Sequence, residues 1–190
     1  MSFLSELQKR KSELKETETV VTKVDGRRFV ERNAETLDTL DPCYGFVVDT
    51  KPDNTPVLVV DNLYIGSQDC AASEVLQLYN IQRVLSLGVG VDVNICSKYV
   101  QCFDLPETDI KPILGASLPF IHEAIENNEN ILIHCNAGVS RTSMVAIAYL
   151  IKYRNMTYED AYALIKLKRP AINPNAGFRK QLMAMSTFKD

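Results

Sequence analysis

A cysteine and an arginine bracket a short loop of small residues in this chain. The apolar run Asn130–Ile133 before the loop predicts a buried strand, and the apolar run that starts at Arg141 predicts a helix. Backbone N–H groups of a loop that enters a helix N-terminus point at a common centre, where the helix dipole adds positive potential. The segment from Cys135 to Arg141 therefore predicts an anion-binding loop.

The first anion that this loop would stabilise is the thiolate of Cys135, which we expect to attack phosphorus. The planar guanidinium of Arg141 can hold two phosphoryl oxygens, which a lysine ammonium cannot do. Gly138 allows a backbone conformation closed to other residues, and Ser140 and Thr142 place hydroxyls near the sulfur. Burial as a small apolar side chain, the commoner fate of cysteine, would leave the glycine and the arginine unexplained.

The loop resembles the phosphate-binding motif of the cysteine-dependent protein tyrosine phosphatases, in the residues His134-Cys135-x-x-Gly138-x-x-Arg141-Thr142. Residues 57–188 resemble the dual-specificity phosphatases of that superfamily, in Leu63-Tyr64-Ile65-Gly66-Ser67, Asn136-Ala137-Gly138-Val139-Ser140-Arg141, Arg169-Pro170 and Pro174-Asn175-x-Gly177-Phe178-x-x-Gln181-Leu182. Within that family, the chain most resembles small atypical phosphatases of the stress-activated kinase pathway, in Gly66-Ser67-Gln68-Asp69 and Asp104-Leu105-Pro106-Glu107-Thr108. The resemblance implies a protein phosphatase that hydrolyses phosphotyrosine and phosphoserine or phosphothreonine through a phosphocysteine intermediate.

A thiolate that displaces an alkoxide or phenolate leaves a basic oxygen, so a nearby carboxylic acid would lower the barrier. Asp104 follows a predicted strand, Tyr99–Phe103, and lies 31 residues before Cys135. It also matches the general-acid position of the resembling family. Asp109 in the same loop is the second candidate, and a helix N-cap or an exposed charge is the alternative reading of Asp104.

The second half-reaction needs a base and a stabilised leaving thiolate. The ionised Asp104 would take a proton from the attacking water, and a hydroxyl of Thr142, or otherwise of Ser140, would steady the departing sulfur; helix capping is the alternative for either hydroxyl. The resemblance implies that Asn175 braces the phosphate loop and that His134 positions the nucleophile, without substrate contact. This chemistry needs no metal or cofactor.

The substrate-binding residues are expected to be Asn136, Ala137, Gly138, Val139, Ser140 and Arg141. All of them except Arg141 are neutral, whereas a polyphosphorylated inositol or an RNA 5′-triphosphate would need further lysines or arginines. The short domain predicts a shallow pocket, open to phosphothreonine and phosphoserine as well as phosphotyrosine. An RNA or lipid phosphatase stays an alternative, as does a non-catalytic phosphoprotein reader that uses the arginine only to bind.

The cysteines do not predict a metal site. They form no CxxC pair and no zinc-like group with the two histidines, His122 and His134. Cys102 precedes Asp104 by two residues and could trap an oxidised Cys135 as a disulfide, although structural burial is the commoner role. Reduced thiols fit the cytoplasm or the nucleus.

Composition excludes several classes of protein. Of 190 residues, 46% are hydrophobic and 24% are charged, which argues against wholesale disorder. A net charge of −3 offers no basic field for nucleic acid or an anionic membrane. The apolar stretch Met144–Ile151 is far shorter than the roughly 20 residues that cross a bilayer. We expect phosphorylated proteins as partners, including MAP or stress-activated kinases or their upstream kinases, and the sequence leaves the oligomeric state open.

These residues need an α/β scaffold to position them. Residues 57–190 alternate between strand-like and helix-like runs, which predicts a central mixed sheet of about five strands flanked by helices. The expected strands are Pro56–Val60, Leu63–Ile65, Arg83–Leu87, Tyr99–Phe103 and Asn130–Ile133. The expected helices are Ala71–Asn80, Pro112–Asn127, Arg141–Arg154, Thr157–Leu167 and Asn175–Phe188.

Residues 1–56 are predicted to form an N-terminal extension to the catalytic domain. Ser2–Glu18 places apolar residues on one face of a charged segment, which predicts a short amphipathic helix. Thr19–Arg32 predicts a hairpin around Asp25-Gly26, and the proline-rich Asp41–Pro56 predicts a connector.

Overall fold

The computed structural model of the chain describes residues 18–22, 28–32, 35–40 and 53–187. The chain divides into two compact units, Met1–Val48 and Asp49–Asp190, each of which is described by itself. The helix expected at Ser2–Glu18 falls outside the described residues except for its last residue. The predicted turn at Asp25-Gly26 also falls outside them, as do most residues of the predicted connector.

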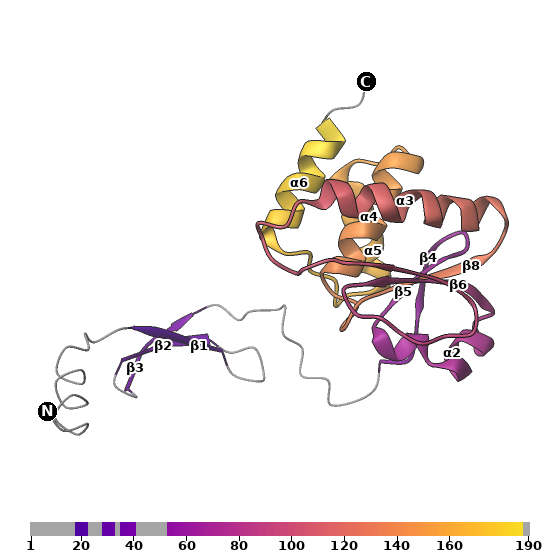
Figure 1. The fold of residues 1–190 in the computed structure, drawn as a ribbon. Helices are drawn as coiled ribbons and strands as arrows, with labels where there is room; N and C mark the ends of the chain where they lie inside the picture. The colour runs from indigo at the N-terminus through magenta and orange to yellow at the C-terminus, as the bar shows by residue number, and fades with distance from the viewer. Residues whose placement is uncertain (1–17, 23–27, 33–34, 41–52, 188–190) are drawn as a thin grey trace, which may run out of the picture. The chain divides into compact units, whose positions relative to one another are not determined.

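The first unit contains an antiparallel sheet of three strands in the order β1-β2-β3 (Figure 1). The strands are β1 (Thr19–Thr22), β2 (Arg28–Arg32) and β3 (Glu35–Leu40). β1 and β2 pair over the segment expected to form a hairpin, with Val20 opposite Val30. Strand β3 was not predicted, because its largely polar sequence lacks the enrichment in β-branched and aromatic residues that indicates a strand.

The second unit contains a five-stranded mixed sheet in the order β4-β5-β8-β6-β7. Its strands are β4 (Val57–Val60), β5 (Leu63–Gly66), β6 (Ile81–Leu87), β7 (Cys96–Val100) and β8 (Asn130–His134). β4 runs antiparallel to β5, and the other neighbours pair in parallel. The prediction of a mixed five-stranded sheet is confirmed.

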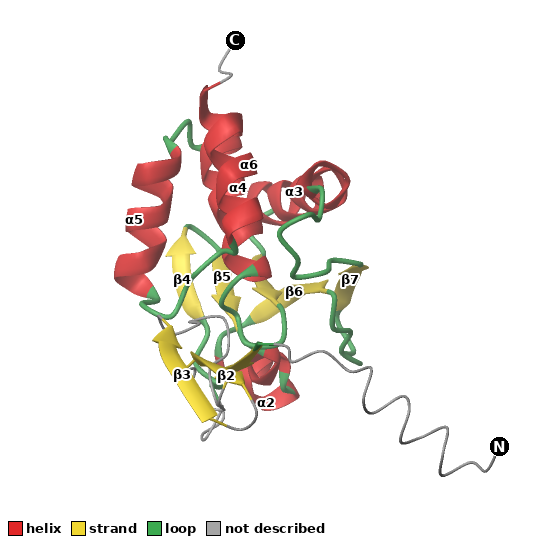
Figure 2. Cartoon of the chain, turned by 90° about the vertical axis from the view of Figure 1, so that its left-hand side faces the viewer, coloured by secondary structure: helices red, strands yellow, loops and turns green. Residues whose placement is uncertain are grey.

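Helices cover both faces of this sheet. They are η1 (Gln68–Ala71), α2 (Ser73–Leu78), α3 (Ile110–Glu126), α4 (Arg141–Tyr153), α5 (Tyr158–Lys168) and α6 (Ala176–Thr187). Figures 1 and 2 show α3, α4, α5 and α6 on one side of the sheet and α2 on the other. The last three helices lie within two residues of their predicted bounds.

Two elements differ from the prediction. The helix expected at Ala71–Asn80 is split into η1 and α2, because Ala72 adopts an extended conformation between them. The strand expected at Tyr99–Phe103 is instead β7, which begins and ends three residues earlier. β7 is an edge strand with exposed polar residues, so it lacks the apolar run that sequence analysis relies on. Asp104 therefore lies four residues beyond its strand, in a loop.

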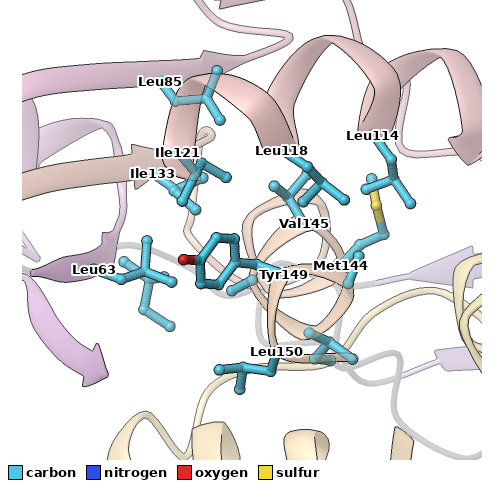
Figure 3. Packing of buried hydrophobic residues seen from close by; sticks show 14 of the residues in the cluster. Leu63, Leu85, Leu114, Leu118, Ile121, Ile133, Met144, Val145, Tyr149 and Leu150 are labelled. Carbon is cyan, nitrogen blue, oxygen red and sulfur yellow. The ribbon is translucent and has the colours of Figure 1, made fainter. Parts of the chain in front are cut away.

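Helix α4 is the centre of the core. Its residues 142–151 are all buried, and Figure 3 shows Met144, Val145 and Tyr149 among side chains of α3 and the sheet. Burial of each large apolar side chain contributes about 1.5–3 kcal/mol. The helix is therefore held on every side, which fixes the position of its first residue, Arg141.

Candidate active site

The predicted phosphate loop joins the carboxyl end of β8 to the N-terminus of α4. β8 lies between β5 and β6 inside the sheet, so its end is fixed on both sides. Gly138 has a positive φ of 65°, and a Cβ there would lie 2.4 Å from the carbonyl oxygen of Gly66. Only glycine fits this position without strain.

Hydrogen bonds from outside the loop hold the carbonyl oxygens of residues 136–139. The N–H of Gln68 donates to Asn136 O at 2.9 Å, Arg169 Nη2 to Ala137 O at 3.2 Å, Arg169 Nε to Gly138 O at 3.1 Å, and the N–H of Asn173 to Val139 O at 3.0 Å. In a trans peptide the C=O and the following N–H point in opposite directions, and no cis peptide occurs among the described residues. The N–H groups of residues 137–140 therefore point away from these partners, in an arrangement that binds anions.

Cys135 lies at the start of this loop and is only 2% exposed. Behind it, the fully buried His134 shares a hydrogen bond of 2.7 Å with Ser86 Oγ through Nε2. Its Nδ1 lies 3.4 Å from Cys135 O. Burial lowers the pKa of His134, against a smaller opposing effect of the Cys135 carbonyl and together with the Arg141 charge. His134 is therefore neutral at physiological pH and lies next to the cysteine backbone, where the sequence placed it.

Arg141 is the first residue of α4, and its side chain is hydrogen bonded to the end of β6. Its Nη1 donates to Leu87 O at 3.0 Å, and a Cβ on Gly88 would lie 2.5 Å from that nitrogen. Its Nε is buried, has no hydrogen-bond partner and lies 3.9 Å from Asp104 Oδ2. A buried donor without a partner is costly, so this nitrogen suits an anion in the loop.

Asp104 is hydrogen bonded to the phosphate loop. Its Oδ1 accepts from Ser140 Oγ at 2.7 Å and from Asn175 Nδ2 at 2.8 Å. Asn175 also donates its own N–H to Ser140 Oγ at 3.1 Å, and its Oδ1 accepts from the N–H of Phe178 in the first turn of α6. Asn175 thus connects Ser140 of the loop, Asp104 and helix α6, and its bracing role stays a prediction.

The sequence left open which carboxylate, Asp104 or Asp109, is the acid. It also left open which hydroxyl, that of Thr142 or of Ser140, stabilises the departing thiolate. Asp109 caps α3, where its Oδ1 accepts from the N–H of Lys111 at 3.0 Å. Its carboxylate therefore has a structural partner, and the capping considered for Asp104 occurs at Asp109. Of the two hydroxyls, that of Ser140 is bonded to Asp104, whereas the buried Thr142 Oγ1 has no hydrogen-bond partner.

Helix α6 holds the loop that carries Asp104. Gln181 Nε2 donates to Thr108 O at 2.9 Å, and its Oε1 accepts from the N–H of Ile110 at 3.1 Å. A Cβ at Gly177 would lie only 1.7 Å from Pro106 O, so the loop packs directly on the glycine. Sequence analysis gave no role to Gly177 or Gln181, although both lie in the quoted motif.

Cys102 is a neutral thiol beside the site. Burial raises its pKa to about 12; the Arg141 charge lowers the pKa, and Asp104 and Cys135 raise it. The thiol is 3% exposed, and its disulfide with Cys135 stays a prediction.

In the described part of the chain, no three or more His, Cys, Asp or Glu side chains cluster so that they could hold a metal ion. Its helices include none with the length and apolar character of a membrane span.

Comparisons with known proteins agree on one family. Residues 63–188 match the family model described as dual specificity phosphatase, catalytic domain. A probable dual specificity protein phosphatase of Dictyostelium discoideum is 34% identical, with 96% of each chain covered. Mouse dual specificity protein phosphatase 19 is 30% identical over 90% of this chain and 84% of its own. The crystal structure of DUSP15 is 30% identical, with a TM-score of 0.66 over 70% of this chain and 88% of that one.

Proposed function

Because the chain belongs to the dual specificity phosphatase family and is a protein-tyrosine/serine/threonine phosphatase, we propose that it works through a phosphocysteine at Cys135. The observation that carries the proposal is that hydrogen bonds from outside the loop hold the carbonyl oxygens of residues 136–139. These hydrogen bonds turn the N–H groups of residues 137–140 away from the outside of the loop, next to the buried sulfur of Cys135. A phosphoryl group is an anion with three oxygens that such a loop can bind.

In the first step the thiolate of Cys135 attacks phosphorus. The S–P bond forms as the bond from phosphorus to the substrate oxygen breaks, and that oxygen takes a proton from Asp104. The loop N–H groups and the unpartnered Nε of Arg141 donate to the phosphoryl oxygens, where negative charge develops. Oδ1 of Asp104 is occupied by two donors, so Oδ2 is the oxygen that carries the proton.

In the second step water attacks the phosphocysteine. Asp104, now a carboxylate, takes a proton from the water as its oxygen bonds to phosphorus, and the S–P bond breaks to release phosphate. Thr142 Oγ1, buried and without a partner, donates to the departing thiolate. Ser140 serves instead to hold Asp104 in place, with Asn175. General acid–base transfer of this kind contributes about 10²–10⁴ in rate.

The substrates are phosphorylated proteins, and we assign MAP or stress-activated kinases, or their upstream kinases, as the class. A relative named as a MAP kinase phosphatase with leucine-rich repeats, from Dictyostelium discoideum, is 33% identical over 67% of this chain and 16% of its own. The four described cysteines are free thiols, which suits the reducing cytoplasm or nucleus.

The test compares turnover of an aryl phosphate and of matched phosphotyrosine and phosphothreonine peptides. Cys135→Ser is expected to abolish turnover while the peptides still bind. Asp104→Asn is expected to lower kcat by about 10²-fold or more with little change in peptide affinity. Asp109→Asn is the matched control, because this carboxylate only caps α3. Turnover by Cys135→Ser would refute the proposal, and an unaltered kcat in Asp104→Asn would refute Asp104 as the general acid. Peptide binding without turnover by the unaltered protein would favour a phosphoprotein reader.

Substrate identity needs a separate experiment. Phosphoproteins captured by Cys135→Ser from stimulated cells are released with vanadate and identified. Recovery of activated kinases, dephosphorylated by the unaltered enzyme in vitro, supports the assigned class. Recovery of other phosphoproteins alone would contradict it.

A further inference from the structure

Asp53 lies before β4, ten residues ahead of the segment that matches the family model. Its backbone is fastened to the turn that follows β5. The carbonyl oxygen of Asp53 accepts from Ser67 Oγ at 2.8 Å and from Cys70 Sγ at 3.1 Å, and its N–H donates to Asp69 Oδ2 at 3.2 Å. Three bonds thus fix the backbone of this residue before its side chain is considered.

The side chain of Asp53 pairs with Arg169. Arg169 Nη2 donates to Asp53 Oδ2, and the arginine side chain is 7% exposed. A buried guanidinium needs a counter-charge, and removal of that partner leaves the cation uncompensated. Asp53 is the one carboxylate paired with Arg169 among the described residues.

Arg169 in turn holds two of the four anchored carbonyls of the phosphate loop. Its Nε and Nη2 bind Gly138 O and Ala137 O, and the planar guanidinium makes these bonds and the bond to Asp53 with one rigid group. The fit is tight, because a Cβ on Gly138 would lie 2.8 Å from Nη2 on one side and 2.4 Å from Gly66 O on the other. A tilt of the guanidinium therefore turns the peptide groups whose N–H atoms face the phosphate.

We propose that Asp53 is a positioning residue of the active site, which aims the N–H groups of Gly138 and Val139 at the phosphoryl group by fixing Arg169. This inference rests on the proposed function, since it assigns the support of the same anion site. Asp53 does not touch substrate. The catalytic unit accordingly depends on a residue that precedes both the family match and the boundary expected at residue 57.

N–H groups that point away from the phosphoryl group bind it less tightly, both in the ground state and in the transition state. Asp53→Ala is expected to weaken orthovanadate binding about tenfold, less than the roughly 10²–10³ that loss of an oxyanion donor costs, because the donors remain present. KM for an aryl phosphate should rise with it. The dependence of kcat on the leaving group should stay unchanged, because Asp104 keeps its own partners.

The chain offers a matched control in the pair of Arg83 with Glu129. Arg83 is 10% exposed against 7% for Arg169, and Glu129 is 34% exposed against 36% for Asp53. This pair lies toward the amino end of β6, whereas the phosphate loop follows the carboxyl end of β8, which runs parallel to it. Glu129→Ala therefore removes an ion pair of similar exposure far from the site, and Arg83 keeps a second carboxylate partner, Glu123.

The experiment measures orthovanadate dissociation constants and free energies of unfolding in urea for the full-length variants. Asp53→Ala should bind about tenfold more weakly, and Asp53→Asn, which keeps an oxygen acceptor for Arg169, should recover most of the affinity. Glu129→Ala should bind as the unaltered protein does. Unchanged vanadate binding in Asp53→Ala, or equal weakening in Glu129→Ala, would overturn the inference.

A double-variant cycle tests the route through Arg169. In an Arg169→Lys background, Asp53→Ala should cost less than about twofold in vanadate affinity, because the two residues act as one unit. A full tenfold cost there would overturn that route. Vanadate binding can be measured without turnover. If Asp53→Ala binds vanadate as the unaltered protein does, and hydrolysis still depends on Cys135, this inference alone is wrong. Absent hydrolysis in the unaltered protein counts against the proposed function alone.

Discussion

A single methyl group on Gly177 should disable the general acid without touching the phosphate loop. The Cβ of Gly177→Ala would lie 1.7 Å from Pro106 O, 2.5 Å from its carbonyl carbon and 2.6 Å from its Cα. All three are backbone atoms, so no flexible side chain can yield. Gly177 lies in the first turn of α6, where alanine is a better helix former than glycine, so the clash is the expected source of harm.

The size of the effect follows from the distances. Pro106 must retreat by about 2 Å to reach an ordinary contact of about 3.5 Å. Asp104 is two residues away, and its bonds to Ser140 and Asn175, at 2.7 and 2.8 Å, would break at such a shift. Since misplacement by about 1 Å can cost about 10² in rate, we expect kcat to fall about 10²-fold for a substrate with a basic leaving group.

The assay compares aryl phosphates whose leaving groups differ in pKa. A substrate with an acidic phenol needs no proton and should lose much less than one with a basic phenol, and vanadate affinity should stay unchanged. Gly115→Ala is the matched control, because a Cβ there meets nothing within 4 Å. It should leave kcat intact. A Gly177→Ala enzyme that hydrolyses the basic substrate at the original rate would refute the reasoning.

The remaining predictions concern single buried groups. Thr142→Ala should slow breakdown of the phosphocysteine about tenfold or more, through loss of a hydrogen bond to a charged sulfur; stopped-flow measurement should then show a burst of phenol, and steady turnover without one would contradict the role. His134 has a lowered pKa, so the unfolded state binds more protons as pH falls below about 6.5, and stability falls with it. His134→Asn should flatten the loss of unfolding free energy between pH 7.5 and 5.5, and an unchanged slope would argue against a buried neutral ring. Cys102, whose pKa burial raises to about 12, should resist iodoacetamide at pH 8 while the exposed Cys96 reacts, as peptide mass spectrometry can measure; alkylation of Cys102 as fast as that of Cys96 would count against its burial.

The sequence predicted the features that lie within one continuous segment. The strand, loop and helix around Cys135 were placed closely, because the motif is contiguous and the apolar runs on each side have the lengths of a strand and a helix. The apolar face of α3 likewise gave its bounds to within two residues. Such patterns record local burial, which is what the spacing of side chains can encode.

The sequence did not predict the contacts between distant segments. Arg169 and Asp53 are separated by 116 positions, and the packing of Pro106 on Gly177 joins a loop to the first turn of α6 with no shared periodic pattern. The preference for Asp104 over Asp109 rested on its place after a predicted strand, its spacing from Cys135 and the resemblance; the capping bond from the N–H of Lys111 to Asp109 could not be read from the sequence. Edge strand β7 was misplaced because its exposed side chains carry no signal of burial.

Trapping of the phosphoenzyme tests the central claim most directly. The enzyme is mixed with a phosphopeptide, quenched in acid within milliseconds, digested and mapped by mass spectrometry. The account predicts a phosphoryl group on the sulfur of Cys135, more abundant in Thr142→Ala and absent in Cys135→Ser. Full turnover with no phosphorylated residue, or with the phosphoryl group on another side chain, would contradict it.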